Sequence, residues 1–181
     1  MKKLIAASVV AISVIAALPA SAVNGNIEFQ GTVIDSGCNV NVAPGHNSSS
    51  SSASLIDLKS VDKASMGTSI GITSNKTAFA LTLSDCPTNM TSASANFDYQ
   101  AAAAGEAYLA NTQATQNGVG MQLFDDNNGS QALVKGVPSA PVALVNNAAV
   151  LPFSVAMVNI QGPGVTAGQV TSSTQYTLVY Q

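Results

Sequence analysis

The stretch Phe79-Ala-Leu-Thr-Leu-Ser-Asp-Cys86 decides the fold of this chain. Its large apolar residues recur at every second position, so they point to one face of an extended strand. The same period of two recurs in residues 27–33, 119–123, 153–157 and 176–180, and turn-forming clusters lie between these rows at 44–47, 125–129 and 161–164. The pattern predicts one core of short antiparallel strands, in an all-β sandwich or barrel.

Two segments depart from this period. Residues 100–110 carry an alanine run that Gly105 interrupts, and we expect a loop or a single helical turn there. Residues 48–52 are all serine, which is typical of a solvated loop.

Residues 1–22 have the pattern of a secretory signal peptide. Lys2 and Lys3 precede an apolar stretch over residues 4–18, and Ala20-Ser-Ala22 supplies small residues at a cleavage site. A membrane anchor is the alternative, but about fifteen apolar residues are short for a span. We expect cleavage after Ala22, which leaves a mature chain that begins at Val23.

The composition excludes several classes of function. Of the 181 residues only 8% are charged, there is no tryptophan, and His46 is the single histidine. Without the leader, four lysines and no arginine stand against nine acidic residues, a net charge of −5. Such a chain repels phosphate backbones, so we expect no nucleic-acid partner. Apart from the neighbours Asp125 and Asp126, the acidic residues are scattered singly, and we expect neither a metal nor a cofactor.

Two short motifs resemble catalytic or calcium sites. Gly67-Thr-Ser69-Ile-Gly71 matches the letters of the nucleophile elbow of hydrolases, but no helical pattern follows it and His46 precedes the serine. The run from Asp125 to Gly129 lacks the later glutamate of a calcium loop and is more typical of a hairpin turn. We therefore expect no enzyme.

Cys38 and Cys86 are the two cysteines, and both follow the leader. An oxidising compartment favours a disulfide between them. A pair of buried free thiols or a metal site with His46 are the alternatives, although the spacing is unlike that of a zinc site.

Both ends of the mature chain are strand-like. An alternating row runs from Val23 through residue 33 with no evident hairpin partner, and a second row ends at Tyr180, one residue before Gln181. The first row predicts a strand that must find its partner elsewhere.

These features together resemble the fimbrial (pilin) subunits of Gram-negative bacteria that the chaperone–usher pathway assembles, in particular the type 1 major subunit family. The resemblance covers nearly the whole mature chain. It rests on features that occur in the family's order: Gly31 seven residues before Cys38, the 79–86 stretch, Gly118-Val-Gly-Met-Gln-Leu-Phe-Asp125, residues 153–157, Gly168 and the penultimate Tyr180.

The resemblance implies an incomplete immunoglobulin-like sandwich that lacks its last strand. Residues 1–22 would be the signal peptide, 23–34 an N-terminal extension and 35–181 the pilin domain. In the family, the extension fills the groove of a neighbouring subunit, which gives a homopolymer. The donor residues would be Ile27, Phe29, Gly31 and Val33.

The resemblance also implies partners and a location. A periplasmic chaperone would cover the groove before an outer-membrane usher assembles the fimbrium on the cell surface. The subunit's side of the groove and chaperone contact would be Gly168, Tyr176, Leu178, Tyr180 and Gln181. The expected role is a structural shaft subunit. The alternative is a minor adaptor or a tip-associated subunit that binds a receptor, although Cys38 lies too near the mature start for an N-terminal lectin domain.

Overall fold

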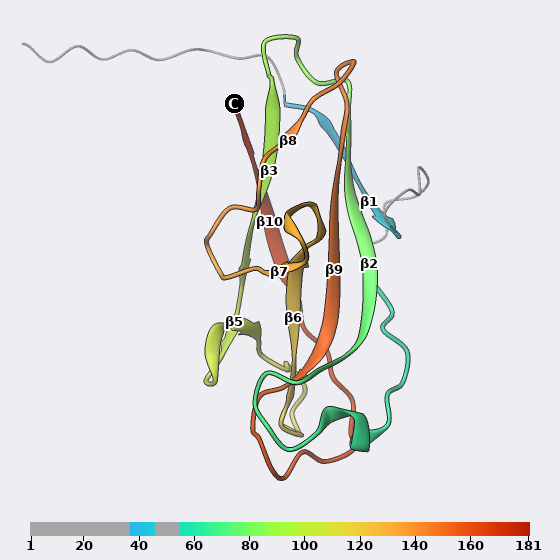
Figure 1. Ribbon diagram of the computed structural model, residues 1–181, viewed down its shortest axis with the longest axis vertical. Helices are drawn as coiled ribbons and strands as arrows, with labels where there is room; N and C mark the ends of the chain where they lie inside the picture. The colour runs from blue at the N-terminus through green and yellow to red at the C-terminus, as the bar shows by residue number, and fades with distance from the viewer. Residues whose placement is uncertain (1–36, 46–54) are drawn as a thin grey trace, which may run out of the picture. The chain divides into compact units, whose positions relative to one another are not determined.

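The computed structural model describes residues 37–45 and 55–181, which fold into two β-sheets (Figure 1). The strands are β1 (Asn39–Pro44), β2 (Thr73–Ser84), β3 (Ser92–Tyr99), β4 (Ala101–Ala102), β5 (Gly105–Leu109), β6 (Val119–Asp125), β7 (Gln131–Ala132), β8 (Val142–Ala143), β9 (Ala149–Asn159) and β10 (Thr174–Tyr180). Two 3₁₀ segments, η1 (Lys63–Met66) and η2 (Asp126–Asn128), complete the described elements. No helix within these residues has the length and apolar character to cross a membrane.

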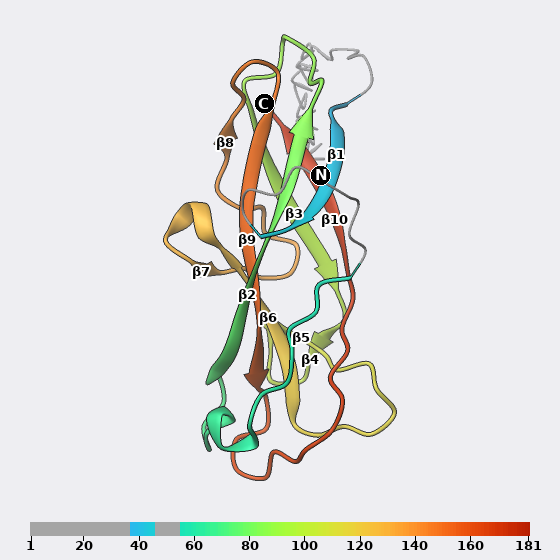
Figure 2. The ribbon, with the colours of Figure 1, turned by 90° about the vertical axis from the view of Figure 1, so that its right-hand side faces the viewer.

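Every strand pairing is antiparallel. The larger sheet has the order β1-β2-β9-β6-β5-β4, with β7 paired to β6, and the smaller sheet has the order β10-β3-β8. Strands β3 and β10 run side by side in both views (Figures 1 and 2). This arrangement confirms the prediction of an all-β sandwich.

The period of two in the 79–86 stretch is that of the large side chains of β2, although the small Ala80 between them is buried as well. Phe79, Leu81 and Leu83 are all buried, because they share the face of the larger sheet that packs on the core. In the register of β2 and β9, Phe79 lies opposite Phe153 and Leu81 lies opposite Leu151. Cross-strand apolar pairs of this kind hold the two longest strands in register.

An aromatic cluster joins the two sheets. Phe153 of β9 packs edge-on against Phe97 of β3, with ring centroids 5.1 Å apart, and its ring centroid is 5.6 Å from that of Phe79. Phe97 comes from the smaller sheet and the other two rings come from the larger one. The cluster is therefore a direct contact between the two layers of the sandwich.

The two cysteines form a disulfide, as the sequence predicted. Cys38 directly precedes β1, and Cys86 lies two residues after the end of β2, with a Cα to Cα distance of 4.2 Å. The bridge therefore ties the beginning of β1 to the end of the strand with which β1 pairs.

The prediction of a loop or a single turn at residues 100–110 was wrong, because this segment forms the β4–β5 hairpin. Leu109 is buried and lies opposite Met121 of β6, so the hairpin extends the larger sheet. Gly120 makes this approach possible: a Cβ atom at that position would collide with the carbonyl oxygen of Leu109. Pairing with a distant strand thus outweighs the weak strand preference of alanine.

The run from Asp125 to Gly129 is a hairpin turn, as predicted. It contains η2, Gly129 has the left-handed φ of 64°, and β7 then pairs back onto β6. The strands predicted at residues 119–123, 153–157 and 176–180 are likewise confirmed, since these residues lie in β6, β9 and β10.

Candidate functional site: a groove between two open sheet edges

Strand β10 lies at the edge of its sheet. It pairs with β3 along seven residues, from Thr174 opposite Tyr99 to Tyr180 opposite Ala93, and with no other strand in the described part of the chain. Strand β1 ends the larger sheet in the same way, because β2 is its one described partner. Backbone groups on such edges are free to pair with an added strand.

A groove of about 1140 Å³ opens beside these edges. Residues 55–61 line it from the segment that lies below β1 in Figure 2, and residues 165–174 line it from the segment that leads up into β10. The interior of the groove is apolar and consists of core-facing side chains: Phe79, Leu81, Phe97, Leu109, Val119, Met121, Leu123, Val155 and Met157. A trench of this composition is suited to apolar side chains and not to a polar small molecule.

Residues 165–173 form one wall of the groove without being a strand, and side-chain hydrogen bonds hold them in place. Asn111, only 3% exposed, donates from Nδ2 to the carbonyl oxygen of Gln169 (3.1 Å) and accepts from the backbone N–H of Thr171 (3.1 Å). The backbone N–H of Thr112 donates to the Thr171 carbonyl at 2.8 Å. The wall is thereby fixed to the connection between β5 and β6.

The last residue of β10 is anchored close to the disulfide. Burial raises the pKa of the Tyr180 hydroxyl, while a backbone hydrogen bond with Cys38 acts in the opposite direction. Gln181 continues the strand: its backbone N–H donates to the Ser92 carbonyl at 3.0 Å, and its main-chain oxygen accepts from the N–H of Thr91 at 2.6 Å. These bonds fix the end of the open edge.

The residues predicted for the groove and chaperone contact occupy different places along it. Gly168 and Tyr176 line the groove, and Tyr176 is 39% exposed. Leu178 and Tyr180 pack against the core cluster, and Gln181 extends the pairing with β3. The predicted donor residues lie outside the described residues, together with the signal peptide and His46; they are Ile27, Phe29, Gly31 and Val33.

Sequence reasoning missed two features of the groove. One is the wall formed by residues 55–61, and the other is the pair of buried amides of Asn111 and Asn117, each 3% exposed. Residues 111–117 are mostly polar and show no strand or helix period. The neighbouring sequence therefore does not indicate which asparagine is buried and which is exposed to solvent. The nearest signals are Gly120, which marks the close approach of the Leu109 backbone, and Gly118, which has a left-handed φ of 77° and lies against the Gln161 side chain.

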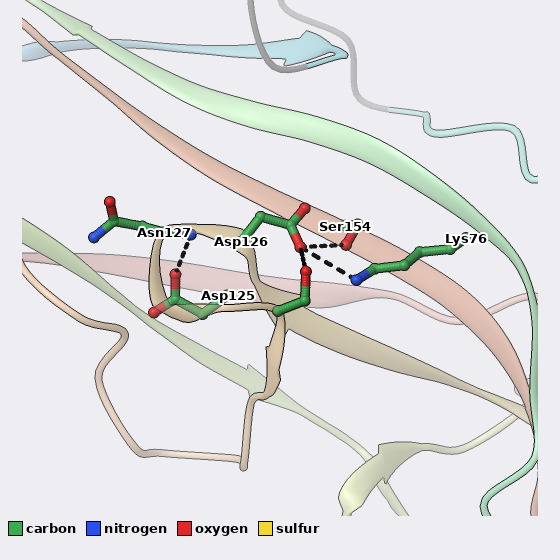
Figure 3. Close-up of polar contacts among 6 residues, drawn as sticks. Lys76, Asp125, Asp126, Asn127 and Ser154 are labelled. Atoms are coloured by element: carbon green, nitrogen blue, oxygen red, sulfur yellow. Dashed lines mark hydrogen bonds and ion pairs between the residues drawn. The ribbon is translucent and has the colours of Figure 1, made fainter.

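A polar cluster lies on the other face of the larger sheet (Figure 3). Asp126 Oδ1 accepts hydrogen bonds from Ser130 Oγ and from Ser154 Oγ (3.0 Å), and it pairs with Lys76 Nζ at 3.2 Å. The Lys76 ammonium also lies 4.4 Å from the centroid of the Phe124 ring. The cluster ties η2 to β2 and β9, which is a structural role.

This cluster predicts a loss of stability in acid. Burial by itself raises the pKa of Asp126, but the hydrogen bonds from Ser130 and Ser154 and the charge of Lys76 bring it below the usual value. A lowered folded-state pKa stabilises the protein above the unfolded value of about 4, and this contribution disappears as the pH falls through the folded-state pKa. We therefore expect Asp126→Asn to lower the stability at pH 7, with a difference from wild type that shrinks below about pH 4.

Urea unfolding followed by circular dichroism at several pH values measures this difference. Asp57→Asn is the control, because Asp57 pairs with Lys59 in full exposure to solvent, where screening weakens the pair. A difference between Asp126→Asn and wild type that stays constant from pH 7 to pH 2 contradicts the prediction.

The described residues do not assemble a catalytic or metal site. Within residues 37–45 and 55–181, no group of three or more His, Cys, Asp or Glu side chains is placed to hold a metal ion. Ser69 lies in the connection between η1 and β2, so no helix follows it as a nucleophile elbow requires. Asp125, at the start of the suspected calcium loop, accepts from the backbone N–H groups of Asn127 (3.0 Å) and Ala140 (2.7 Å).

Solved structures that share the fold include components of pili. A chain of a chaperone–usher pilus superposes with a TM-score of 0.62 at 19% identity, over 91% of this chain and 99% of that one. The P pilus rod subunit PapA gives 0.63 at 16% identity, over 81% and 100%. The CupB6 tip adhesin from Pseudomonas aeruginosa gives 0.61 at 23% identity, over 80% of this chain and 39% of the adhesin. These likenesses establish the immunoglobulin-like pilin fold.

A search of curated protein sequences found no match. The family model described as "Fimbrial protein", in contrast, matches residues 27–181. This match covers the N-terminal row from residue 27 onward, the C-terminal row, the disulfide and every residue of the groove. The chain therefore belongs to the fimbrial protein family, a structural and non-enzymatic class.

Proposed function

We propose that this chain is a rod subunit of a chaperone–usher fimbrium, in which residues 23–34 of one copy fill the groove of the next. The observation that carries this proposal is the apolar groove beside the open edge of β10. A sandwich with an exposed trench and an unpaired edge tends to aggregate unless a strand covers both. A strand supplied by a second copy covers them and links the copies at the same time.

The length and period of the N-terminal row suit this task. Residues 27–33 span seven positions, as does β10, and seven residues of strand extend about 23 Å. The row alternates, so Ile27, Phe29 and Val33 face one side together. Gly31 lies in the same row and allows the backbone to approach a shallow part of the groove.

The energy of this insertion is considerable. Burial of the Ile27, Phe29 and Val33 side chains contributes roughly 6 kcal/mol before entropic costs, at about 2 kcal/mol per side chain. Backbone pairing with the β10 edge adds further hydrogen bonds. The inserted strand completes the sandwich of the subunit that receives it. Strand pairing between successive subunits therefore holds the fibre together.

An unassembled subunit needs a temporary cover. We propose that a periplasmic chaperone lends a strand to the groove after the leader 1–22 has directed export, and that an outer-membrane usher then exchanges it for the next subunit's extension. The subunit side of this contact is the open edge of β10, with Tyr176, Leu178, Tyr180 and Gln181, together with Gly168 in the wall. The assembled fimbrium lies on the cell surface.

Removal of the donor strand tests the proposal. We expect the chain without residues 23–33 to form no fibres and no SDS-resistant ladder, while it still copurifies with a chaperone, because its own groove is intact. Electron microscopy and unheated SDS gels measure the two outcomes. Thr32→Ala is the matched control, since Thr32 lies in the polar face of the row and should not enter the groove. Fibres formed by the deletion variant refute donor-strand assembly.

The rod role and the adaptor or tip role predict different positions in the fibre. Similarity to PapA extends over the whole of that rod subunit, whereas similarity to the CupB6 tip adhesin covers 39% of its chain, and this difference favours the rod. Immunogold labelling of native fimbriae should therefore decorate the whole shaft. Labelling confined to the fibre ends supports the adaptor or tip role.

A further inference from the structure

We infer that Asn117 is a specificity-determining residue of the groove, whose side-chain amide donates a hydrogen bond to a main-chain carbonyl oxygen of the inserted strand. The inference rests on the proposed function, because the inserted strand is residues 23–34 of a second copy. It adds a polar anchor beside the apolar side chains of the groove's interior.

The environment of Asn117 fixes the direction of its amide. Its Oδ1 accepts one hydrogen bond from Asn111 Nδ2 at 3.1 Å and another from the backbone N–H of Val119 at 3.2 Å. Two donors converge on this atom, so it is the oxygen, and the amide nitrogen is on the other side. Asn111 is itself held by the wall at Gln169 and Thr171, which makes the orientation rigid.

The amide nitrogen of Asn117 is left without a partner. The side chain is 3% exposed and lines the groove, yet its Nδ2 donates no hydrogen bond within the described residues. Asn117 Nδ2 is not among the fully buried unpaired side-chain atoms of the described residues, which are Asn41 Oδ1 and Asn96 Oδ1, so in the open groove it still reaches water. An inserted strand excludes that water, and the donor then needs an acceptor from the strand, because an unpaired donor buried in an interface forfeits the bond it makes in water.

Gly168 keeps the amide uncovered. A Cβ atom at Gly168 would lie 3.3 Å from Asn117 Nδ2, and both residues line the groove. The backbone of Gly168 has no left-handed φ, so its conformation does not by itself require glycine. The missing side chain therefore leaves a small polar notch at the wall, formed by Asn117 and Gly168.

The acceptor for the Asn117 amide is a main-chain carbonyl oxygen, because the groove-facing side chains of the inserted strand carry no acceptor of their own. The side chains that face the groove are Ile27, Phe29 and Val33, with Gly31 between them, and none of these carries an acceptor. The carbonyl groups of the inserted strand are the acceptors that reach a buried amide. A donor at one fixed point favours one register of the strand over its neighbours.

Asn117→Asp tests this role with little change in shape. Asp retains an oxygen for Asn111 and Val119 and replaces the free donor by a charged acceptor, which repels a carbonyl. We expect the full-length variant to bind a fluorescent synthetic peptide of residues 23–34 about tenfold more weakly than wild type, or worse. Gly168→Ala should weaken binding in the same direction, because its Cβ narrows the notch. Asn146→Asp, which adds the same charge in an exposed turn, should bind as wild type does.

A second measurement observes the amide itself. The side-chain NH₂ signal of Asn117 is assigned by its loss in Asn117→Asp, and we expect it to shift and to exchange more slowly when the unlabelled peptide binds wild type. The inference is overturned if both Asn117→Asp and Gly168→Ala bind the peptide with wild-type affinity, or if the peptide does not affect the amide signal. Either result leaves the proposed function standing. Failure of wild type to bind the peptide overturns both. If circular dichroism shows that Asn117→Asp does not fold, the peptide affinity of Gly168→Ala alone tests the inference.

Discussion

Replacement of both cysteines by alanine is expected to lower the free energy of unfolding by about 4 kcal/mol, because the bridge closes a loop across a sequence separation of 48 residues. In the chain-entropy model, a cross-link of that span removes this much freedom from the unfolded chain. The loss is a large fraction of the total stability of an ordinary domain. Alanine is chosen because Cys86 is buried, and serine would place a hydroxyl group there without a partner.

The same substitution should also impair assembly. Cys38 directly precedes β1, whose one described pairing is with β2, and Tyr180 at the end of β10 contacts the Cys38 backbone. Without the bridge, both open edges lose their common anchor. Urea unfolding by circular dichroism and SDS-resistant ladders measure the two effects, with chemically reduced wild type as the control. A midpoint equal to that of the oxidised wild type contradicts the first expectation.

Phe153→Ala should lower the free energy of unfolding by a similar amount, about 4 kcal/mol. The Phe153 side chain is 1% exposed, and its ring packs against Phe97 of the other sheet and against Phe79 of its own sheet. Removal of the ring leaves a cavity at the contact between the two layers. Because Phe79 and Phe97 line the groove, we also expect the variant to bind the peptide of residues 23–34 more weakly.

Phe124→Ala is the matched control for this prediction. Phe124 is half-buried on the opposite face of β6, where its ring lies under the Lys76 ammonium. Its removal takes away part of one surface contact and opens no cavity between the sheets, so the cost should be about 1 kcal/mol. Equal losses in Phe124→Ala and Phe153→Ala would show that the inter-sheet cluster has no special role.

The strands that the sequence predicted well are those in which large apolar residues recur at every second position. Residues 79–83 of β2, 119–123 of β6 and 153–157 of β9 have this pattern, and its physical cause is local, since successive side chains of a strand point to opposite faces. The sequence also predicted the disulfide and the turn at Asp125 to Gly129. A chain with two cysteines that is exported to an oxidising compartment favours a disulfide between them, and Asp, Asn and Gly favour the backbone conformations of a turn.

The segment 100–110 could not be predicted in this way. Its alanines carry little preference for a strand, and the hairpin exists because Leu109 meets Met121 of β6 and Gly120 admits the backbone. The position of Asn117 belongs to the same class. Its role depends on Asn111, on Gly168 and on the wall that residues 165–173 form, none of which is its immediate neighbour in the sequence.

The sequence by itself determined the strand-rich character, the cysteine pair and the strand at residues 176–180, because each of these depends on residue type and local spacing. Only the tertiary structure decided that β10 is an open edge, that residues 55–61 and 165–174 line a groove with an apolar interior beside it, and that one amide donor in that groove has no partner among the described residues. The reason is physical: pairing and burial depend on segments far apart along the chain, and their effect on a side chain appears only when those segments meet.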